Sequence, residues 1–169
     1  MTVVILIGAS GAGKTTIAQE IERRHGNEFD VFYFDRIGVP STEEMLATHG
    51  SGEAWQRAKT FEWLHRIATL PNPTRPILFE GQTRLSYLAE AAASAGGLRY
   101  VPVLVDCDDQ TRIDRLSSAR NQPDLANEHM MNWARYLRNE AHKDGCRILD
   151  TSSMSLDDWV TYVVNLMRA

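Results

Sequence analysis

The chain has 169 residues, a length typical of one globular domain. Hydrophobic residues make up 43% of it and charged residues 24%, which excludes the low hydrophobicity and high charge of disordered chains. The net charge of −4 and the pI near 5.7 disfavour non-specific binding to nucleic acid or an anionic membrane, because both depend on clustered lysine and arginine. We therefore expect a single domain over residues 1–169 that partners neither nucleic acid nor membrane.

The two cysteines, Cys107 and Cys146, have neither the spacing of a zinc site nor the number needed for a disulfide framework. This favours a reducing, cytoplasmic location, although each cysteine is equally explained as a small buried residue. The apolar start Val3–Ile7 lacks a basic region before it and leads directly into a glycine-rich loop, so we do not interpret it as a signal peptide. No other stretch is apolar for long enough to span a bilayer.

Apolar strands and helices alternate along the chain. Short β-branched and aromatic runs bounded by turn residues predict strands over residues 3–7, 31–34, 76–80, 100–106 and 147–149. Helical spacing of apolar residues predicts helices over residues 15–24, from Ser41, and over 53–70, 85–95, 110–119, 127–142 and 156–167. Right-handed crossovers between such strands give an α/β fold, a three-layer α/β/α sandwich with a five-stranded parallel sheet, in which ligands bind beyond the carboxyl ends of the strands.

The segment between the first strand and the first helix matches the phosphate-binding pattern G-x-x-x-x-G-K-[ST]. Its glycines let backbone N–H groups converge on a polyphosphate, and the helix that follows adds unpaired donors at its N-terminus. The alternative is a glycine-rich turn capped by threonines. Lys14 is the expected catalytic cation at the β- and γ-phosphates, and Thr15 the expected Mg²⁺ ligand. The residues expected to bind the nucleotide are Gly8, Ser10, Gly11, Ala12, Gly13, Lys14, Thr15 and Thr16.

The segment Phe79-Glu80-Gly81-Gln82-Thr83-Arg84 follows the third strand. Together with the phosphate loop it resembles the small P-loop kinases of the adenylate-kinase-like group, which includes nucleotide, shikimate and gluconate kinases and has Asp-Gly-x-x-Arg at this point. The resemblance implies a P-loop NTPase fold with a short lid and Mg-ATP-dependent phosphoryl transfer to a small-molecule acceptor. It implies that Glu80 lies near the Mg²⁺ and borders the acceptor, and that Arg84 binds the acceptor and takes part in catalysis.

Both assignments have plainer alternatives. Glu80 also fits a helix cap or a surface ion pair, and Arg84 a solvated residue at the start of a helix. The helix dipole disfavours arginine at that position, which favours the functional interpretation of Arg84.

Asp35 and Arg36 follow the second strand, at the sheet edge that also carries the phosphate loop. We interpret Asp35 as the general base that accepts the hydroxyl proton of the acceptor, and Arg36 as a further acceptor-binding residue. The alternative is a turn-forming aspartate beside a solvated arginine. The acceptor-binding segment is expected over about residues 36–70. Aromatic residues at helical spacing within it are interpreted as core: Trp55, Phe61 and Trp63.

Arginines without any lysine occur between residues 112 and 138. The family resemblance places a mobile lid there, in which Arg115 and Arg120 contact the nucleotide and Arg120 also acts in catalysis, since planar guanidinium groups suit phosphates. Arg135 and Arg138 share one face of the following helix, so both are expected to swing toward the phosphates and the acceptor when the lid closes. Either also fits a solvated helix face. Arg112 is interpreted as a surface residue.

Two further expectations concern the whole site. Asp150-Thr151-Ser152 resembles the loop that lies against the base in these kinases and contacts it with backbone atoms.

A GTPase is disfavoured because Asn121-Gln122-Pro123-Asp124 lacks the lysine of the guanine-binding motif and follows a helix. The competing interpretation is a P-loop ATPase or nucleotide-binding switch that acts on a protein partner. A dependence of ATP turnover on a small acceptor distinguishes a kinase from a switch.

Overall fold

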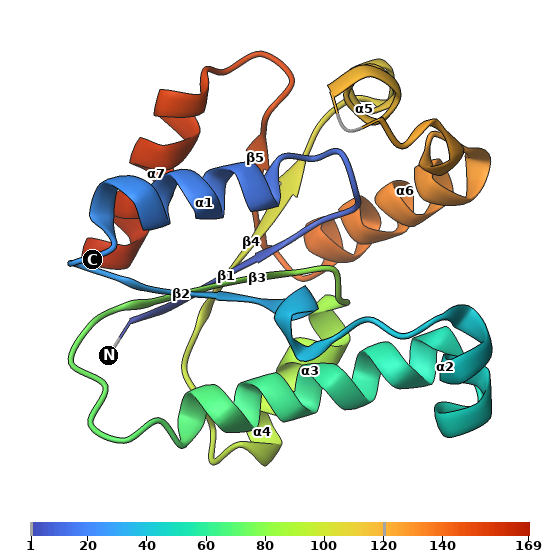
Figure 1. Ribbon diagram of the computed structural model, residues 1–169. Coiled ribbons are helices and arrows are strands. Elements are labelled where there is room, and N and C mark those ends of the chain that lie inside the picture. Colours follow the sequence, from blue (N-terminus) through green and yellow to red (C-terminus); the bar gives the residue numbers. More distant parts are fainter. Residues whose placement is uncertain (1, 120) are drawn as a thin grey trace.

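The computed structural model describes residues 2–119 and 121–169 (Figure 1). Its described strands form one sheet in the order β2-β3-β1-β4-β5, and each neighbouring pair is parallel. The strands are β1 (Val3–Ile7), β2 (Asp30–Tyr33), β3 (Ile77–Gly81), β4 (Val101–Asp106) and β5 (Arg147–Asp150). The predicted five-stranded parallel sheet is confirmed, with strand ends displaced by one residue or so.

The central strand shows why the sheet is covered on both sides. All five residues of β1 are buried. Alternate side chains of a strand point to opposite faces, so Ile5 and Ile7 belong to one core cluster while Val4 and Leu6 belong to another. A continuous apolar run is therefore what this position in the sheet requires.

Helices cover both faces of the sheet (Figure 1). On one face α1 (Lys14–His25) and α7 (Leu156–Arg168) pack around Leu6, and on the other α3 (Gly52–Ala68), α4 (Leu85–Ser94) and α6 (Glu128–Lys143) pack around Phe79. This arrangement is the predicted three-layer sandwich. No helix among the described residues is long and apolar enough to cross a membrane.

The segments that flank the site have local features of their own. Ser41 caps α2 (Thr42–His49) by accepting the backbone N–H of Glu44, whose carboxylate accepts the N–H of Ser41 in return. The helix predicted over 110–119 consists of α5 (Asp109–Asp114) followed by a π-helical turn, Arg115–Ala119. Short 3₁₀ turns span Phe34–Ile37 after β2 and Pro123–Leu125 in the predicted interruption.

Candidate active site

The predicted phosphate loop lies between β1 and α1 and passes close to the end of β4. Gly8 has φ +152°, and a Cβ added to it would lie 2.2 Å from the carbonyl oxygen of Val105. Only glycine permits that approach. Gly13, with φ +104°, forms the N-cap of α1 without a side-chain cap, so the first turn of the helix opens onto the loop. The geometry suits a polyphosphate held by backbone N–H groups.

A cavity of about 260 Å³ adjoins the loop on the side of α7. The guanidinium carbon of Arg115 lies 5.3 Å from the ring centroid of Trp159, so two planar side chains form part of the wall. Planar groups of this kind stack on a nucleobase. The cavity is lined by Gly11, Gly13, Lys14, Thr15, Thr16, Arg115 and Trp159.

Thr151, directly after β5, connects this cavity to the loop. Its side chain is 1% exposed, and its hydroxyl donates to the carbonyl of Ala12 at 2.7 Å. Arg115 donates to the same hydroxyl at 2.9 Å and to the Thr151 carbonyl at 2.7 Å. The sequence interpretation gave this residue only a backbone role, whereas its side chain is a structural link between the phosphate loop and Arg115.

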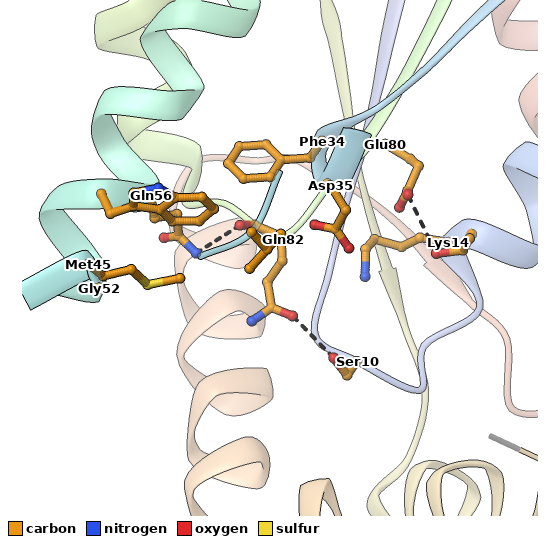
Figure 2. Close-up of a pocket in the computed structure, with 13 residues that line it drawn as sticks. Ser10, Lys14, Phe34, Asp35, Met45, Gly52, Gln56, Glu80 and Gln82 are labelled. Atoms are coloured by element: carbon orange, nitrogen blue, oxygen red, sulfur yellow. Dashed lines mark hydrogen bonds between the residues drawn. The ribbon is translucent and has the colours of Figure 1, made fainter. Parts of the chain in front are cut away.

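A second cavity, of about 440 Å³, lies on the other side of the loop between the ends of β2 and β3 and helices α2 and α3. Figure 2 shows that the Asp35 carboxylate and the Lys14 amine point into the same part of it. The cavity is lined by Ser10, Lys14, Thr15, Phe34, Asp35, Val39, Met45, Gly52, Trp55, Gln56, Glu80, Gly81 and Gln82. Lys14 and Thr15 line both cavities, so each cavity borders the residues predicted to lie at the transferred phosphate.

The residues predicted to bind Mg²⁺ face each other across this junction. The Thr15 hydroxyl lies 3.5 Å from a carboxylate oxygen of Glu80, which is only 5% exposed. Within residues 2–119 and 121–169, no cluster of three or more His, Cys, Asp or Glu side chains forms a complete metal cage. Mg²⁺ commonly takes one or two protein oxygens together with phosphate oxygens and waters, and a hydroxyl beside a buried carboxylate fits that chemistry.

Two glutamines link the second cavity to the phosphate loop. The side-chain amide of Gln56 on α3 donates to the backbone carbonyl of Gln82 at 2.8 Å. The Ser10 hydroxyl donates to the side-chain oxygen of Gln82 at 3.3 Å, and Figure 2 shows both bonds as dashed lines. Helix α3, the end of β3 and the loop are thereby connected by side-chain hydrogen bonds.

Arg84 is not among the residues that line the two cavities. It precedes α4 as the N-cap residue and forms an ion pair of 2.9 Å with Glu53 on α3. Its guanidinium carbon lies 4.9 Å from the ring centroid of Tyr136 and 5.7 Å from that of Trp133, both on α6. Arg84 therefore joins three helices, and its contact with the acceptor stays a prediction.

The interpretation of Arg112 as a surface residue is wrong. Its side chain is fully buried beneath the phosphate loop, where it donates to Asp106 at 2.8 Å and to the Ser10 carbonyl at 2.8 Å. Arg138 on α6 binds the other oxygen of Asp106 at 2.6 Å. A buried carboxylate therefore holds two arginines, one of them fully buried, because a buried cation needs an anionic partner. Arg138 is a partner of Asp106 in the structure, and its movement toward the phosphates and the acceptor stays a prediction.

The remaining predicted arginines lie outside the two cavities or outside the described residues. Arg36 stacks over the ring of Tyr33 at 4.2 Å and lies 3.7 Å from Glu22, beside Asp35. Arg135 is exposed and donates to Asn132 on its own helix. Arg120 lies outside the described residues. Their roles, and the motion of the lid over about residues 112–138, stay predictions.

Sequence reasoning missed several cavity residues for one shared reason. Trp55 and Phe34 are 6% and 2% exposed and belong to the core, and the same side chains also line the second cavity. Helical spacing signals burial but does not show that the buried face also borders a cavity.

Burial also governs the thiol beneath the loop. Cys107 is 2% exposed and its sulfur approaches the Gly11 carbonyl at 3.8 Å. Desolvation raises the pKa of this thiol above its ordinary value, with the nearby charge of Arg112 opposing the shift. The thiol therefore stays protonated near neutral pH, and we assign it no chemical role.

The chain was compared with protein families and with curated protein sequences. A family model described as an AAA domain matches residues 4–133. The matched range begins in β1 and ends within α6, and it includes the phosphate loop, Asp35 and Glu80. A search of curated protein sequences gave no significant match.

Solved structures with this fold include a shikimate kinase from Acinetobacter baumannii in complex with shikimate, 18% identical over 98% of this chain and 92% of that chain, with a TM-score of 0.64. A gluconokinase from Sinorhizobium meliloti 1021 is 16% identical over 99% and 91%, with a TM-score of 0.64. A deoxyadenosine kinase from M. mycoides with bound dATP is 14% identical over 100% of both chains, with a TM-score of 0.66. At these identities the similarity establishes the fold that the sequence motifs predicted.

Proposed function

Because the chain belongs to the AAA domain family and has the fold of small P-loop kinases, we propose that it transfers the γ-phosphate of Mg-ATP to a hydroxyl group of a small-molecule acceptor. One observation carries the proposal. The cavity beside Arg115 and Trp159 and the cavity beside Asp35 and Gln56 adjoin at Lys14 and Thr15. A kinase needs two such spaces that meet at the phosphate, whereas binding of a nucleotide alone needs one.

The residues at the junction have distinct parts in the proposed reaction. Lys14 and the backbone of the loop hold the β- and γ-phosphates. Thr15 and Glu80 are the residues that would hold a Mg²⁺ ion, and the ion would neutralise phosphate charge. Asp35 accepts the acceptor's hydroxyl proton while the new O–P bond forms and the bond between the γ-phosphorus and the bridging oxygen breaks, which releases ADP. Arg115 and Trp159 hold the base.

The test is an acceptor screen with ATP labelled at the γ-phosphate. We expect label to appear in a small-molecule product, and Lys14→Ala to lower kcat/KM by roughly 100-fold or more, the effect of removing a donor to transition-state charge. Lys143→Ala is the matched control, since Lys143 is exposed at the end of α6 and remote from the loop. Product formation by Lys14→Ala at the parent rate contradicts the proposed mechanism.

The same screen separates the kinase from the competing function. An ATPase or a switch with a protein partner turns over ATP at a rate that small acceptors do not change. A kinase with an empty acceptor cavity hydrolyses ATP slowly, and its consumption of ATP rises with acceptor concentration to a plateau. ATP turnover that no acceptor in a broad panel accelerates favours the switch.

A further inference from the structure

We infer that the acceptor is an uncharged, hydroxyl-bearing molecule with a planar nitrogenous ring, the class represented by nucleosides, rather than an acid or a phosphate ester. The inference rests on the proposed function and concerns the cavity between β2, β3, α2 and α3. It follows from the charges, amides and apolar side chains that line that cavity.

The charge of the lining argues against an anionic acceptor. Among the described residues that line the cavity, Lys14 is the only lysine or arginine, while Asp35 and Glu80 supply carboxylates. The proposed reaction uses Lys14 for the phosphates of ATP. Glu80 is assigned to the metal, so a carboxylate or phosphate on the acceptor would lie beside the Asp35 carboxylate with no further lysine or arginine in the described lining, and a charge without a partner is disfavoured.

The two arginines that directly follow lining residues Asp35 and Gln56 in the chain have anionic partners. Arg57 on α3 binds Glu90 on α4, and Arg36 lies over Tyr33 near Glu22.

Arg84, the residue that the family pattern assigns to the acceptor, is held more firmly. Glu53 pairs with it at 2.9 Å and also accepts a hydrogen bond from Tyr87 at 2.7 Å. The rings of Tyr87 and Tyr136 lie 5.3 and 4.9 Å from the Arg84 guanidinium carbon. Moving Arg84 into the cavity would break this ion pair and expose the aromatic contacts, so Arg84 acts here as a link between helices.

The polar groups that remain for the acceptor are mainly neutral amides. The nitrogen of the Gln56 side chain is bound to the Gln82 carbonyl, and the oxygen of the Gln82 side chain is bound to Ser10. Each amide therefore has its orientation fixed by one bond and keeps a second polar atom for a ligand. Figure 2 shows both amides beside the cavity, between Met45 and Ser10. Two fixed amides suit the paired donors and acceptors on the edge of a nitrogenous ring.

Apolar side chains form the rest of the wall. Trp55 and Phe34 meet edge to face with centroids 5.8 Å apart, and Met45 lies on the facing helix α2. Such a surface suits the flat face of a ring more than a polyol covered with hydroxyl groups. Asp35 lies toward the Lys14 end of the same cavity, where the hydroxyl of a bound sugar would meet the γ-phosphate (Figure 2).

The experiment compares acceptors in pairs in which one member is neutral and the other carries an anionic group. Each of the common nucleosides is assayed against its own 5′-monophosphate, and an uncharged sugar alcohol against the corresponding sugar acid, with labelled ATP. We expect at least one nucleoside to have a kcat/KM about 100-fold or more above that of its monophosphate. A monophosphate or an acid that is phosphorylated more efficiently than every neutral compound overturns the inference.

Binding is measured separately, so that failure of phosphoryl transfer does not obscure the acceptor class. Calorimetric titration in the presence of a non-hydrolysable ATP analogue reports whether the nucleoside binds more tightly than its monophosphate. Nucleoside binding without transfer contradicts the proposed function and supports the acceptor class. Tighter binding of the monophosphate overturns the acceptor class even if transfer occurs.

Gln56→Leu tests whether the side-chain amide of Gln56 forms hydrogen bonds with the acceptor. The variant keeps the size of the side chain, and we expect the KM for the best nucleoside to rise about 10-fold or more while the KM for ATP stays near the parent value. Gln110→Leu is the matched control, since Gln110 is an exposed residue of α5. A rise in both KM values would indicate a general structural role for Gln56, and an unchanged acceptor KM would remove it from the acceptor site.

Discussion

The buried Asp106 offers the sharpest test of how the phosphate loop is supported. Asp106→Asn keeps the shape of the side chain and removes its charge. Arg112, with a fully buried side chain, then loses its ion-pair partner, while Arg138 keeps about a third of its side chain in contact with water. Because Arg138 can hydrate, most of the energetic cost falls on Arg112, whose surroundings offer little except the carbonyls of Ser10 and Cys107.

Removal of one partner from a buried ion pair costs about 3–5 kcal/mol. The amide oxygen of asparagine still accepts one hydrogen bond, so we expect the free energy of unfolding to fall by about 3 kcal/mol, the lower end of that range. For a chain of this size each kcal/mol corresponds to about 2–4 °C in Tm, so Tm should fall by roughly 6–12 °C. This is a large share of the 5–15 kcal/mol that is typical of folded domains.

Urea unfolding followed by circular dichroism measures the free energy, and a fluorescent ATP analogue measures nucleotide affinity. Since Arg112 holds the Ser10 carbonyl, we expect affinity to fall together with stability. The matched control is Asp114→Asn on exposed α5, which should change the free energy of unfolding by less than about 0.5 kcal/mol. A loss below about 1 kcal/mol for Asp106→Asn would show that the buried arginine does not depend on this carboxylate.

Three further predictions concern single side chains near the loop. Gly81→Ala places a Cβ 2.7 Å from the Cβ of Phe34, so the free energy of unfolding in urea should fall by about 1–3 kcal/mol and the KM for the acceptor should rise. Unchanged values of both would contradict the close approach. Thr151→Val removes the bond to the Ala12 carbonyl and should cost about 1–3 kcal/mol with weaker nucleotide binding, whereas Thr151→Ser should retain both. Burial raises the pKa of Cys107, so in a Cys146→Ala background a thiol reagent should label the folded protein far more slowly than the urea-unfolded one; equal rates would refute the burial. The folded-state pKa lies above that of the unfolded thiol, about 8.5, so this thiol's contribution to stability should be lost as pH rises through the alkaline range.

The parts of the site that were predictable depend on backbone constraints that a short sequence encodes. Gly8 and Gly13 have positive φ values that glycine tolerates, and the strand before them and the helix after them appear in the sequence as apolar runs. Asp35 was proposed from the rule that residues at the ends of parallel strands meet at one edge of the sheet, and Glu80 from the family resemblance; both line the second cavity, and their roles stay predictions. In each case the position follows from local sequence and sheet order, without knowledge of side-chain packing.

The roles predicted for the arginines were harder to assign, because each depends on the anionic partner that the fold brings to the arginine. Arg112 reads as a surface residue because arginine usually is one, and only the fold brings it under the loop beside Asp106. Arg84 matches a position of the family pattern, yet it forms an ion pair with Glu53, which lies 31 residues earlier in the chain. No local sequence pattern predicts this pair. Ion pairs between distant segments decide whether an arginine is available to a ligand, so a motif can supply the residue type without supplying its role.

The two cavities differ in the charged side chains that line them. The nucleotide side has a lysine and an arginine at its surface, Lys14 and Arg115, which suits a polyphosphate. The proposed acceptor cavity shares Lys14 but has no arginine in its described lining, which includes two carboxylates, two amides and two aromatic rings, while Arg84 pairs with Glu53 and lies against tyrosine rings. Replacing Glu53 with glutamine weakens the hold on Arg84, and the inference then predicts that anionic acceptors gain relative to neutral ones. A Glu53→Gln enzyme whose preference between a nucleoside and its monophosphate equals that of the parent would show that Arg84 has no part in the choice.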